Sequence, residues 1–166
     1  MFTIKDFSTA LYALSKAKGY ALTVILTLGL TLGSLVAMFN LMHCKELTGQ
    51  ERALGSAGFA AGQFSQTQIE RLQTLIDAQE RCFELFREFS NSAALQLWQQ
   101  HATHAYLIEI ERLRRMILTP TKPTAWRIPV DQDDQWFALL TQRIDDLKSV
   151  ETALEVHLQH LCEQKL

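Results

Sequence analysis

The chain has 166 residues, of which 48% are hydrophobic and 20% are charged, and its formal net charge is −2. This length and composition fit one compact domain together with one non-globular segment. The small net charge offers no electrostatic footprint for nucleic acid, so no nucleic-acid partner is expected. Strand-like alternation is missing throughout, and an all-α fold is therefore predicted.

Residues 20–39 form an apolar run, YALTVILTLGLTLGSLVAMF, without a charged side chain. A helix of this length spans about 30 Å, the thickness of the hydrocarbon core of a bilayer. Lys5, Lys16 and Lys18 precede the run, which places the N-terminus in the cytoplasm by the positive-inside rule. A cleavable signal peptide is the alternative, but the run is long for one. The bacterial inner-membrane protein predicted on this basis has a cytoplasmic amphipathic lead-in (1–19), one transmembrane helix (20–42) and a periplasmic bundle (43–166).

Capping signals predict the helices that follow this run. The first helix is expected to continue from the membrane and to end near Gly62. A second helix begins at Ser65, because Gln68 three residues later completes a capping box. The third begins near residues 91–92 and runs to a loop at 119–130 that contains all three prolines. A fourth helix follows, and the four are expected to form an up-down-up-down bundle.

The fourth helix carries an arginine at an apolar position. Acidic residues at 131–134 favour its start, where the helix dipole stabilises negative charge. Arg143 interrupts an apolar stripe with spacings of three and four residues. A guanidinium that faces a bundle interior keeps its charge and requires an internal carboxylate or a bound anion. The apolar members of the stripe include Trp136, Leu140, Leu147, Val150 and Leu154.

A second arginine is expected at the same level of the bundle. Arg52 precedes the end of the first helix by about ten residues, and Arg143 follows the start of the fourth by about as many, which places both roughly 15 Å from one end. With Gln79 and Thr141 as neighbouring polar groups, the two form a candidate anion-binding site. The alternative pairs Arg143 with Glu109 and leaves Arg52 on the surface.

Three glycines follow Arg52 in the first helix, at positions 55, 58 and 62. Glycine lowers helix propensity by up to about 1 kcal/mol, so its repeated use requires a reason. One reason is close packing against another helix, and the other is room for a small ligand. Both interpretations remain open from the sequence.

Four segments resemble the nitrate- and nitrite-sensing (NIT) domain of bacterial receptors: ELTGQERALGSAGFAAGQFS, ERLQTLIDAQERCFELFREFS, EIERLRRMIL and QWFALLTQRIDDLKSVETAL. The resemblance extends over about residues 46–158. It implies a helical sensor that holds nitrate or nitrite through arginines of its first and last helices, here Arg52 and Arg143. It also implies a homodimer. No output domain is recognisable after the bundle, so the signalling partner is unknown, and the predicted function is membrane-anchored nitrate or nitrite sensing for signal transduction.

The first part of the chain has a second resemblance. Residues 7–40, FSTALYALSKAKGYALTVILTLGLTLGSLVAMFN, are similar to the first transmembrane helix of permease subunits from macrolide-exporter-type ABC transporters. This resemblance implies an alternative function, in which a permease-derived or transport accessory protein uses the bundle for protein interaction. A purely structural bundle is a third reading.

The histidine pattern is weak evidence for a metal site. Two His-x-x-His pairs occur, His101 with His104 and His157 with His160. Antiparallel register sets His101 opposite about Val150, so the two pairs cannot meet, and either pair alone has too few ligands for a structural zinc. Neither a metal nor another cofactor is expected.

Catalysis is not expected either. The sequence contains no nucleophile elbow, phosphate-binding loop or spaced carboxylate pair, so the chain is predicted not to be an enzyme. Cys44 and Cys162 are both expected at the membrane-proximal end of the bundle, where a disulfide is geometrically allowed. Unpaired buried cysteines are nevertheless commoner in helical bundles, and this pairing is left open.

Overall fold

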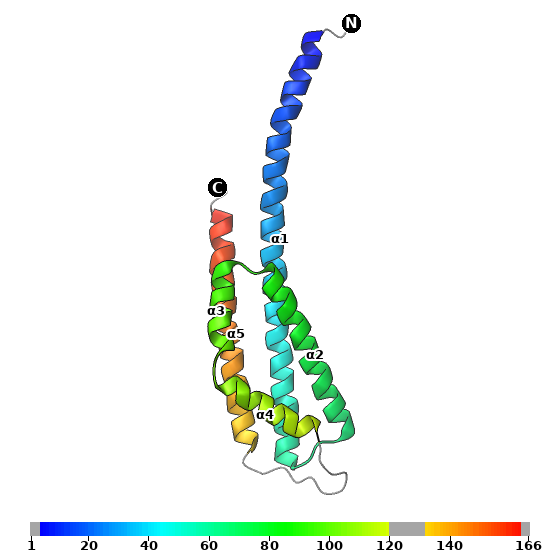
Figure 1. The fold of residues 1–166 in the computed structure, drawn as a ribbon, viewed down its shortest axis with the longest axis vertical. Helices are drawn as coiled ribbons and strands as arrows, with labels where there is room; N and C mark the ends of the chain where they lie inside the picture. Colours follow the sequence, from blue (N-terminus) through cyan, green and yellow to red (C-terminus); the bar gives the residue numbers. More distant parts are fainter. Residues whose placement is uncertain (1–3, 120–131, 164–166) are drawn as a thin grey trace.

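The computed structural model describes residues 4–119 and 132–163, with side chains from residue 28 onward except at residues 30 and 162. All regular secondary structure in this part of the chain is α-helical, which confirms the all-α class. A long first helix packs against α2 and α5, α3 lies beside α5, and α4 crosses obliquely near the end where the first helix turns into α2 (Figure 1). The helices are α1 (Ile4–Ala61), α2 (Gln66–Phe89), α3 (Ser92–Ala102), α4 (Tyr106–Leu118) and α5 (Gln132–Glu163).

The predicted helix ends are confirmed where capping residues mark them. Gly62 follows α1 with a φ of +67°, a left-handed conformation that glycine adopts without steric cost. Ser65 caps α2: its hydroxyl accepts from the Gln68 amide at 3.3 Å, and its own amide donates to the Gln68 side chain at 2.8 Å. Asn91 caps α3 by accepting from the amide of Ala94 at 2.9 Å. These caps satisfy amides that lack helical partners.

The predicted third helix is wrong in one respect, because the structure divides it into α3 and α4. The break comprises Thr103, His104 and Ala105, and contains neither glycine nor proline. Tertiary contacts favour it instead: the side chains of His104 and Tyr106 both reach Asp146 of α5. The described residues therefore form five helices where four were expected, and α1 includes the segment predicted to cross the membrane. The proline-containing loop lies outside the described residues after Thr119.

Two hydrophobic clusters form most of the core, and α5 contributes to both. The apolar stripe predicted for α5 is buried from Trp136 to Leu154, as expected for a helix that packs against several neighbours. The cluster near the turn between α1 and α2 comprises Phe59, Leu72, Ile76, Ile110, Leu113, Ile117, Trp136 and Leu140. The cluster at the other end comprises Ala37, Leu41, Phe86, Ala94, Leu147, Val150 and Leu154.

Gly55 allows the close contact between α1 and α5. A Cβ at this position would overlap the indole ring of Trp136, which also donates a hydrogen bond from Nε1 to the Arg52 carbonyl at 3.1 Å. A Cβ at Gly58 would overlap the ring of Phe64. Both glycines therefore accommodate aromatic side chains, which supports the packing interpretation of the series.

The predicted transmembrane helix at residues 20–42 is wrong. In the part of the chain described, no helix is both long enough and apolar enough to cross a membrane. Ala37 and Leu41, within the predicted span, have exposed fractions of 0% and 1% because they pack in the bundle core. A buried helix and a membrane helix use the same apolar residues, so composition did not distinguish them. The predicted inner-membrane location and periplasmic placement depended on this helix and are corrected with it.

Candidate functional site

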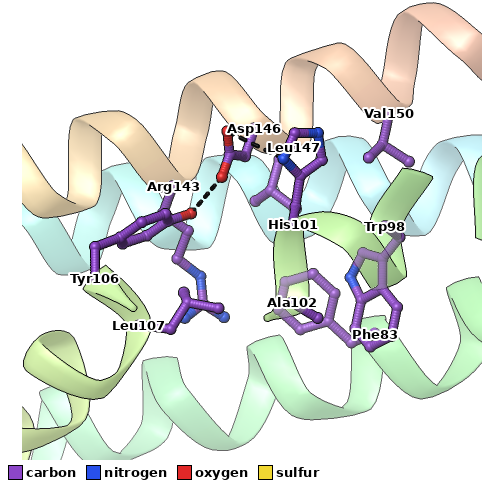
Figure 2. Close-up of a pocket in the computed structure, with 10 residues that line it drawn as sticks. All are labelled: Phe83, Trp98, His101, Ala102, Tyr106, Leu107, Arg143, Asp146, Leu147 and Val150. Atoms are coloured by element: carbon purple, nitrogen blue, oxygen red, sulfur yellow. Dashed lines mark hydrogen bonds and ion pairs between the residues drawn. The ribbon is translucent and has the colours of Figure 1, made fainter. Parts of the chain in front are cut away.

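A pocket of about 410 Å³, which includes space open to solvent, lies among α2, α3, α4 and α5 (Figure 2). Its lining is mostly apolar, and a few polar side chains from α3, α4 and α5 converge on it. This combination is typical of small-ligand sites. The apolar lining consists of Phe83, Trp98, Ala102, Leu107, Leu147 and Val150, and the polar lining of His101, Tyr106, Arg143 and Asp146.

Arg143 brings a partly buried positive charge to this pocket. Its guanidinium carbon lies 5.3 Å from the centre of the Phe83 ring, a cation–π contact. Among the described residues it has neither an ion pair nor a hydrogen bond through its side chain. Burial lowers the pKa of the guanidinium, and the positive charge of Arg114 lowers it further. Since an arginine remains protonated in spite of this, the pocket contains a cation without an ion-pair partner in the described part of the chain.

Asp146 faces the same pocket but does not neutralise Arg143. Its Oδ2 accepts a hydrogen bond from the Tyr106 hydroxyl at 2.6 Å and contacts His104 Nδ1 at 2.9 Å. Burial, followed by the contact with Asp146, raises the pKa of Tyr106, so its hydroxyl remains a donor. Figure 2 shows the Asp146 carboxylate directed toward Tyr106 and His101. Its Oδ2 is therefore occupied by Tyr106 of α4 and by His104 of the break between α3 and α4.

The alternative partner considered for Arg143 is engaged elsewhere. Glu109 Oε1 accepts hydrogen bonds from Arg112 Nε at 2.8 Å and from Gln135 Nε2 at 2.9 Å. The Arg112 contact, with burial acting in the opposite direction, lowers the pKa of Glu109. The hypothesis that Arg143 pairs with Glu109 is therefore not supported.

Arg52 lies against α5, but outside the pocket lining. Its Nη1 donates to the Thr141 hydroxyl at 2.8 Å, and its guanidinium carbon lies 4.7 Å from the centre of the Phe137 ring. The contact with Thr141 agrees with the expected antiparallel register. Residues two apart on a helix point to different sides, however, so Thr141 and Arg143 project from different faces of α5. The structure thus brings Arg52 and Thr141 together and separates both from the pocket of Arg143.

Gln79, the fourth predicted site residue, belongs to a buried polar cluster. Its Nε2 donates to Glu51 Oε2 at 2.7 Å, and its Oε1 accepts from the Thr48 hydroxyl at 3.1 Å. Only 1% of Gln79 is exposed, and it is absent from the pocket lining. Its amide is therefore engaged within the core between α1 and α2.

Glu51 and Arg114 form a buried charged pair that sequence reasoning missed. Arg114 donates from Nε to Glu51 Oε1 and from Nη2 to Glu51 Oε2, both at 2.6 Å, which is a bidentate ion pair. Burial opposes the charge on Arg114, but Glu51 and Glu111 outweigh it and raise the pKa. A sequence signal existed, because Arg114 is spaced from Ile110 and Ile117 as an inward-facing residue would be.

Cys44 is a free and fully buried thiol, so it is not half of a disulfide with Cys162. Its Sγ donates to the Gln79 carbonyl at 3.4 Å. Burial and the neighbouring thiol of Cys82 raise the pKa of Cys44. A thiol with a raised pKa is a poor nucleophile, and Cys44 therefore serves packing.

Comparisons with known proteins agree on one family. Residues 30–159 match the NIT family, described as nitrate and nitrite sensing. The chain is similar to a nitrate regulatory protein of Klebsiella oxytoca, with 36% identity over 137 residues that cover 81% of this chain and 33% of the relative. It is also similar to the solved structure of the NasR transcription antiterminator, with a TM-score of 0.72, 35% identity, and coverage of 82% of this chain and 36% of the other. The chain spans about a third of the length of both.

These relatives correct two further predictions. One similar protein is described as a transcription antiterminator, which contradicts the prediction that nucleic acid is not a partner. The net charge of −2 belongs to a chain that spans only 36% of that structure. The predicted membrane-anchored sensor is likewise corrected: both relatives are regulatory by name, and the described helices include no membrane span.

Proposed function

Because the chain belongs to the NIT family, we propose that it is the nitrate- and nitrite-sensing part of a regulatory protein, and that the anion binds to Arg143. The family match and the names of both relatives support sensing. The observation that carries the location is a partly buried guanidinium that lines a pocket and has no ion-pair partner among the described residues. By analogy with the antiterminator, recognition here regulates transcription, and no catalytic step is involved.

The chemistry of the pocket suits nitrate and nitrite. Both are planar anions whose oxygen pairs match the parallel N–H groups of a guanidinium. The apolar walls formed by Phe83, Trp98 and Leu107 lower the local dielectric, which strengthens a charge-assisted hydrogen bond. An anion would also relieve the repulsion between Arg143 and Arg114 that is reflected in the pKa of Arg143. Binding therefore compensates a charge that the fold leaves unpaired.

Arg52 is the second candidate contact, favoured by its fixed position. Thr141 and Phe137 hold its guanidinium at the junction of α1 and α5. Its remaining N–H groups make no hydrogen bond among the described residues, which leaves them available to an anion. A single anion held by Arg52 and Arg143 together requires a side-chain rearrangement, since they project to different sides of α5. Variants of each arginine distinguish these arrangements.

The test is anion-dependent unfolding of the 166-residue chain. Nitrate or nitrite at a hundred times Kd should raise the free energy of unfolding by about 2.7 kcal/mol. Chloride should have a much smaller effect, because a spherical ion cannot engage both N–H groups of the fork in the same way. Arg143→Ala should abolish the nitrate effect, and Arg143→Lys should restore only part of it, since an ammonium lacks the planar fork.

Two further variants complete the experiment. Arg71→Ala, which removes an exposed arginine of α2, should leave the nitrate effect unchanged. Arg52→Ala should reduce it if Arg52 is a second contact. Loss of the effect in Arg52→Ala together with its retention in Arg143→Ala would move the site to the junction of α1 and α5. Absence of any nitrate or nitrite effect on the wild-type chain would overturn the proposed function.

A further inference from the structure

Two histidines and one aspartate converge on the wall of the pocket. His101 comes from α3, His104 from the break between α3 and α4, and Asp146 from α5. One ligand atom from each lies within 4.8 Å of the others. All three side chains are partly buried, and the helix break is what allows His101 and His104 to approach the same carboxylate. Nothing in the proposed anion contact uses this cluster as a whole.

Hydrogen bonding around His101 fixes its tautomer. The Ser149 hydroxyl donates to the Asp146 carbonyl at 2.7 Å, which uses its only hydrogen. The contact of 2.8 Å between Ser149 Oγ and His101 Nε2 must therefore have Nε2–H as the donor. In a neutral imidazole the other nitrogen, Nδ1, then carries a lone pair.

That lone pair faces a carboxylate. His101 Nδ1 lies 3.3 Å from Asp146 Oδ1, yet it is buried and makes no hydrogen bond with any described residue. A nitrogen lone pair and a carboxylate oxygen at this distance repel each other unless a proton or a metal cation lies between them. Ligand atoms at about 2.0–2.1 Å from a tetrahedral zinc ion are roughly 3.3 Å apart, which is the observed separation.

We infer that His101, His104 and Asp146 form a binding site for a divalent transition-metal ion, with Zn²⁺ as the best match. Two imidazoles and one carboxylate are ligands that zinc prefers, and three protein ligands leave one coordination position open. Ser149 supplies the outer contact that orients a metal-binding imidazole. Tyr106 does the same for Asp146 by donating to Oδ2, which leaves Oδ1 for the metal.

The site goes beyond nitrate sensing and does not depend on it. The sequence disfavoured a metal because each His-x-x-His pair by itself offers too few ligands. Asp146 supplies the missing ligand from a different helix, 42 residues after His104. Only the tertiary structure places it there.

The experiment uses the whole chain, titrated with Zn²⁺ by calorimetry and with Co²⁺ as an absorbing substitute. One ion per chain should bind, and cobalt should show the visible absorption of a four- or five-coordinate site. No intense thiolate band is expected, which would separate this site from Cys44 and Cys82. Asp146→Asn, which preserves shape, and His104→Ala, whose side chain is 41% exposed, should each weaken binding roughly tenfold or more.

His157→Ala is the matched control, because it removes a histidine of the other His-x-x-His pair and should leave the affinity unchanged. Circular dichroism of each variant checks that the helices remain formed. Failure of the wild-type chain to bind either ion at one per chain would overturn the inference, as would equal affinity in Asp146→Asn and the wild type. His101 would then be an imidazolium paired with Asp146.

Discussion

Two arginines of this bundle, Arg114, which is buried, and Arg143, which is partly buried, have opposite environments. Arg114, on α4, donates two hydrogen bonds of 2.6 Å to the carboxylate of Glu51. Arg143, on α5, contacts an aromatic ring, lines a pocket and has no carboxylate partner among the residues that the structure describes. The pKa of Arg114 is raised and that of Arg143 is lowered. A paired buried cation belongs to the structure, whereas an unpaired one beside a pocket is available to bind an anion.

The two arginines differ because the carboxylates near them have different hydrogen-bond partners. Glu51 is fully buried and directs both oxygens to Arg114. Asp146 is close to Arg143 in the pocket lining, yet it is engaged with Tyr106 and the two histidines. The same residue types therefore give a closed ion pair in one region and an open cation in the other.

Arg114→Met should have the largest effect on stability. It leaves the Glu51 carboxylate buried without its cation, which costs about 3–5 kcal/mol in the free energy of unfolding. Arg143→Met should cause no comparable loss, because it removes a cation that has no partner to leave behind. Urea denaturation of the two variants without nitrate measures the difference. The double variant Glu51→Leu with Arg114→Met should be more stable than Arg114→Met alone, and equal losses in the two single variants would contradict the comparison.

Gly55→Ala should have an intermediate effect and tests what sets the distance between α1 and α5, the helices that carry Glu51 and Arg143. The new methyl group would overlap the Trp136 indole, and overpacking of this kind costs about 1–3 kcal/mol. Gly49→Ala is the control on the same helix: its Cβ would meet nothing within 4 Å, so it should be neutral or should stabilise by up to about 1 kcal/mol. Thermal unfolding compares the two, and equal melting temperatures would show that Trp136 does not fix the spacing.

Tyr106→Phe should have the smallest effect on stability and should act only on the pocket. Loss of the hydrogen bond to Asp146 costs about 1 kcal/mol. The carboxylate then carries more unshared negative charge near Arg143, so nitrate affinity measured by calorimetry should fall. The ion pair of Arg114 should be unaffected, and Arg114→Met should cost the same in both backgrounds. An unchanged nitrate affinity would show that Asp146 does not influence the anion.

Local patterns predicted much of this fold. Ser65 with Gln68, Asn91 and Gly62 mark helix ends because their side chains or backbone conformations act on neighbouring amides. The spacing of the α5 stripe predicted its buried face, including the inward position of Arg143. Helical rise placed His101 opposite about Val150, and the observed contact is with Ser149. Each of these features depends on residues within one helix or on simple antiparallel register.

Features that need several helices were missed. The break between α3 and α4 follows no glycine or proline and depends on Asp146 of α5. Arg52 lies outside the pocket because it contacts the side of α5 that carries Thr141, whereas Arg143 projects from another side. The sequence estimate gave only the height of the two arginines along the bundle axis and not the side of α5 on which each lies. A helix whose residues near position 40 pack in the core was read as a membrane helix, since both environments select apolar side chains.

Sequence alone settled the helical class, the principal caps and the presence of a charge in the apolar face of α5, because backbone hydrogen bonding and side-chain periodicity act over a few residues. It also carried the family resemblance that the comparisons confirm. Contacts between helices far apart in the chain decided the other features. They determine which arginine is neutralised, which carboxylate contacts the histidines, and where a pocket opens. Coulombic interaction and burial depend on distance in space, and only the packed bundle fixes those distances.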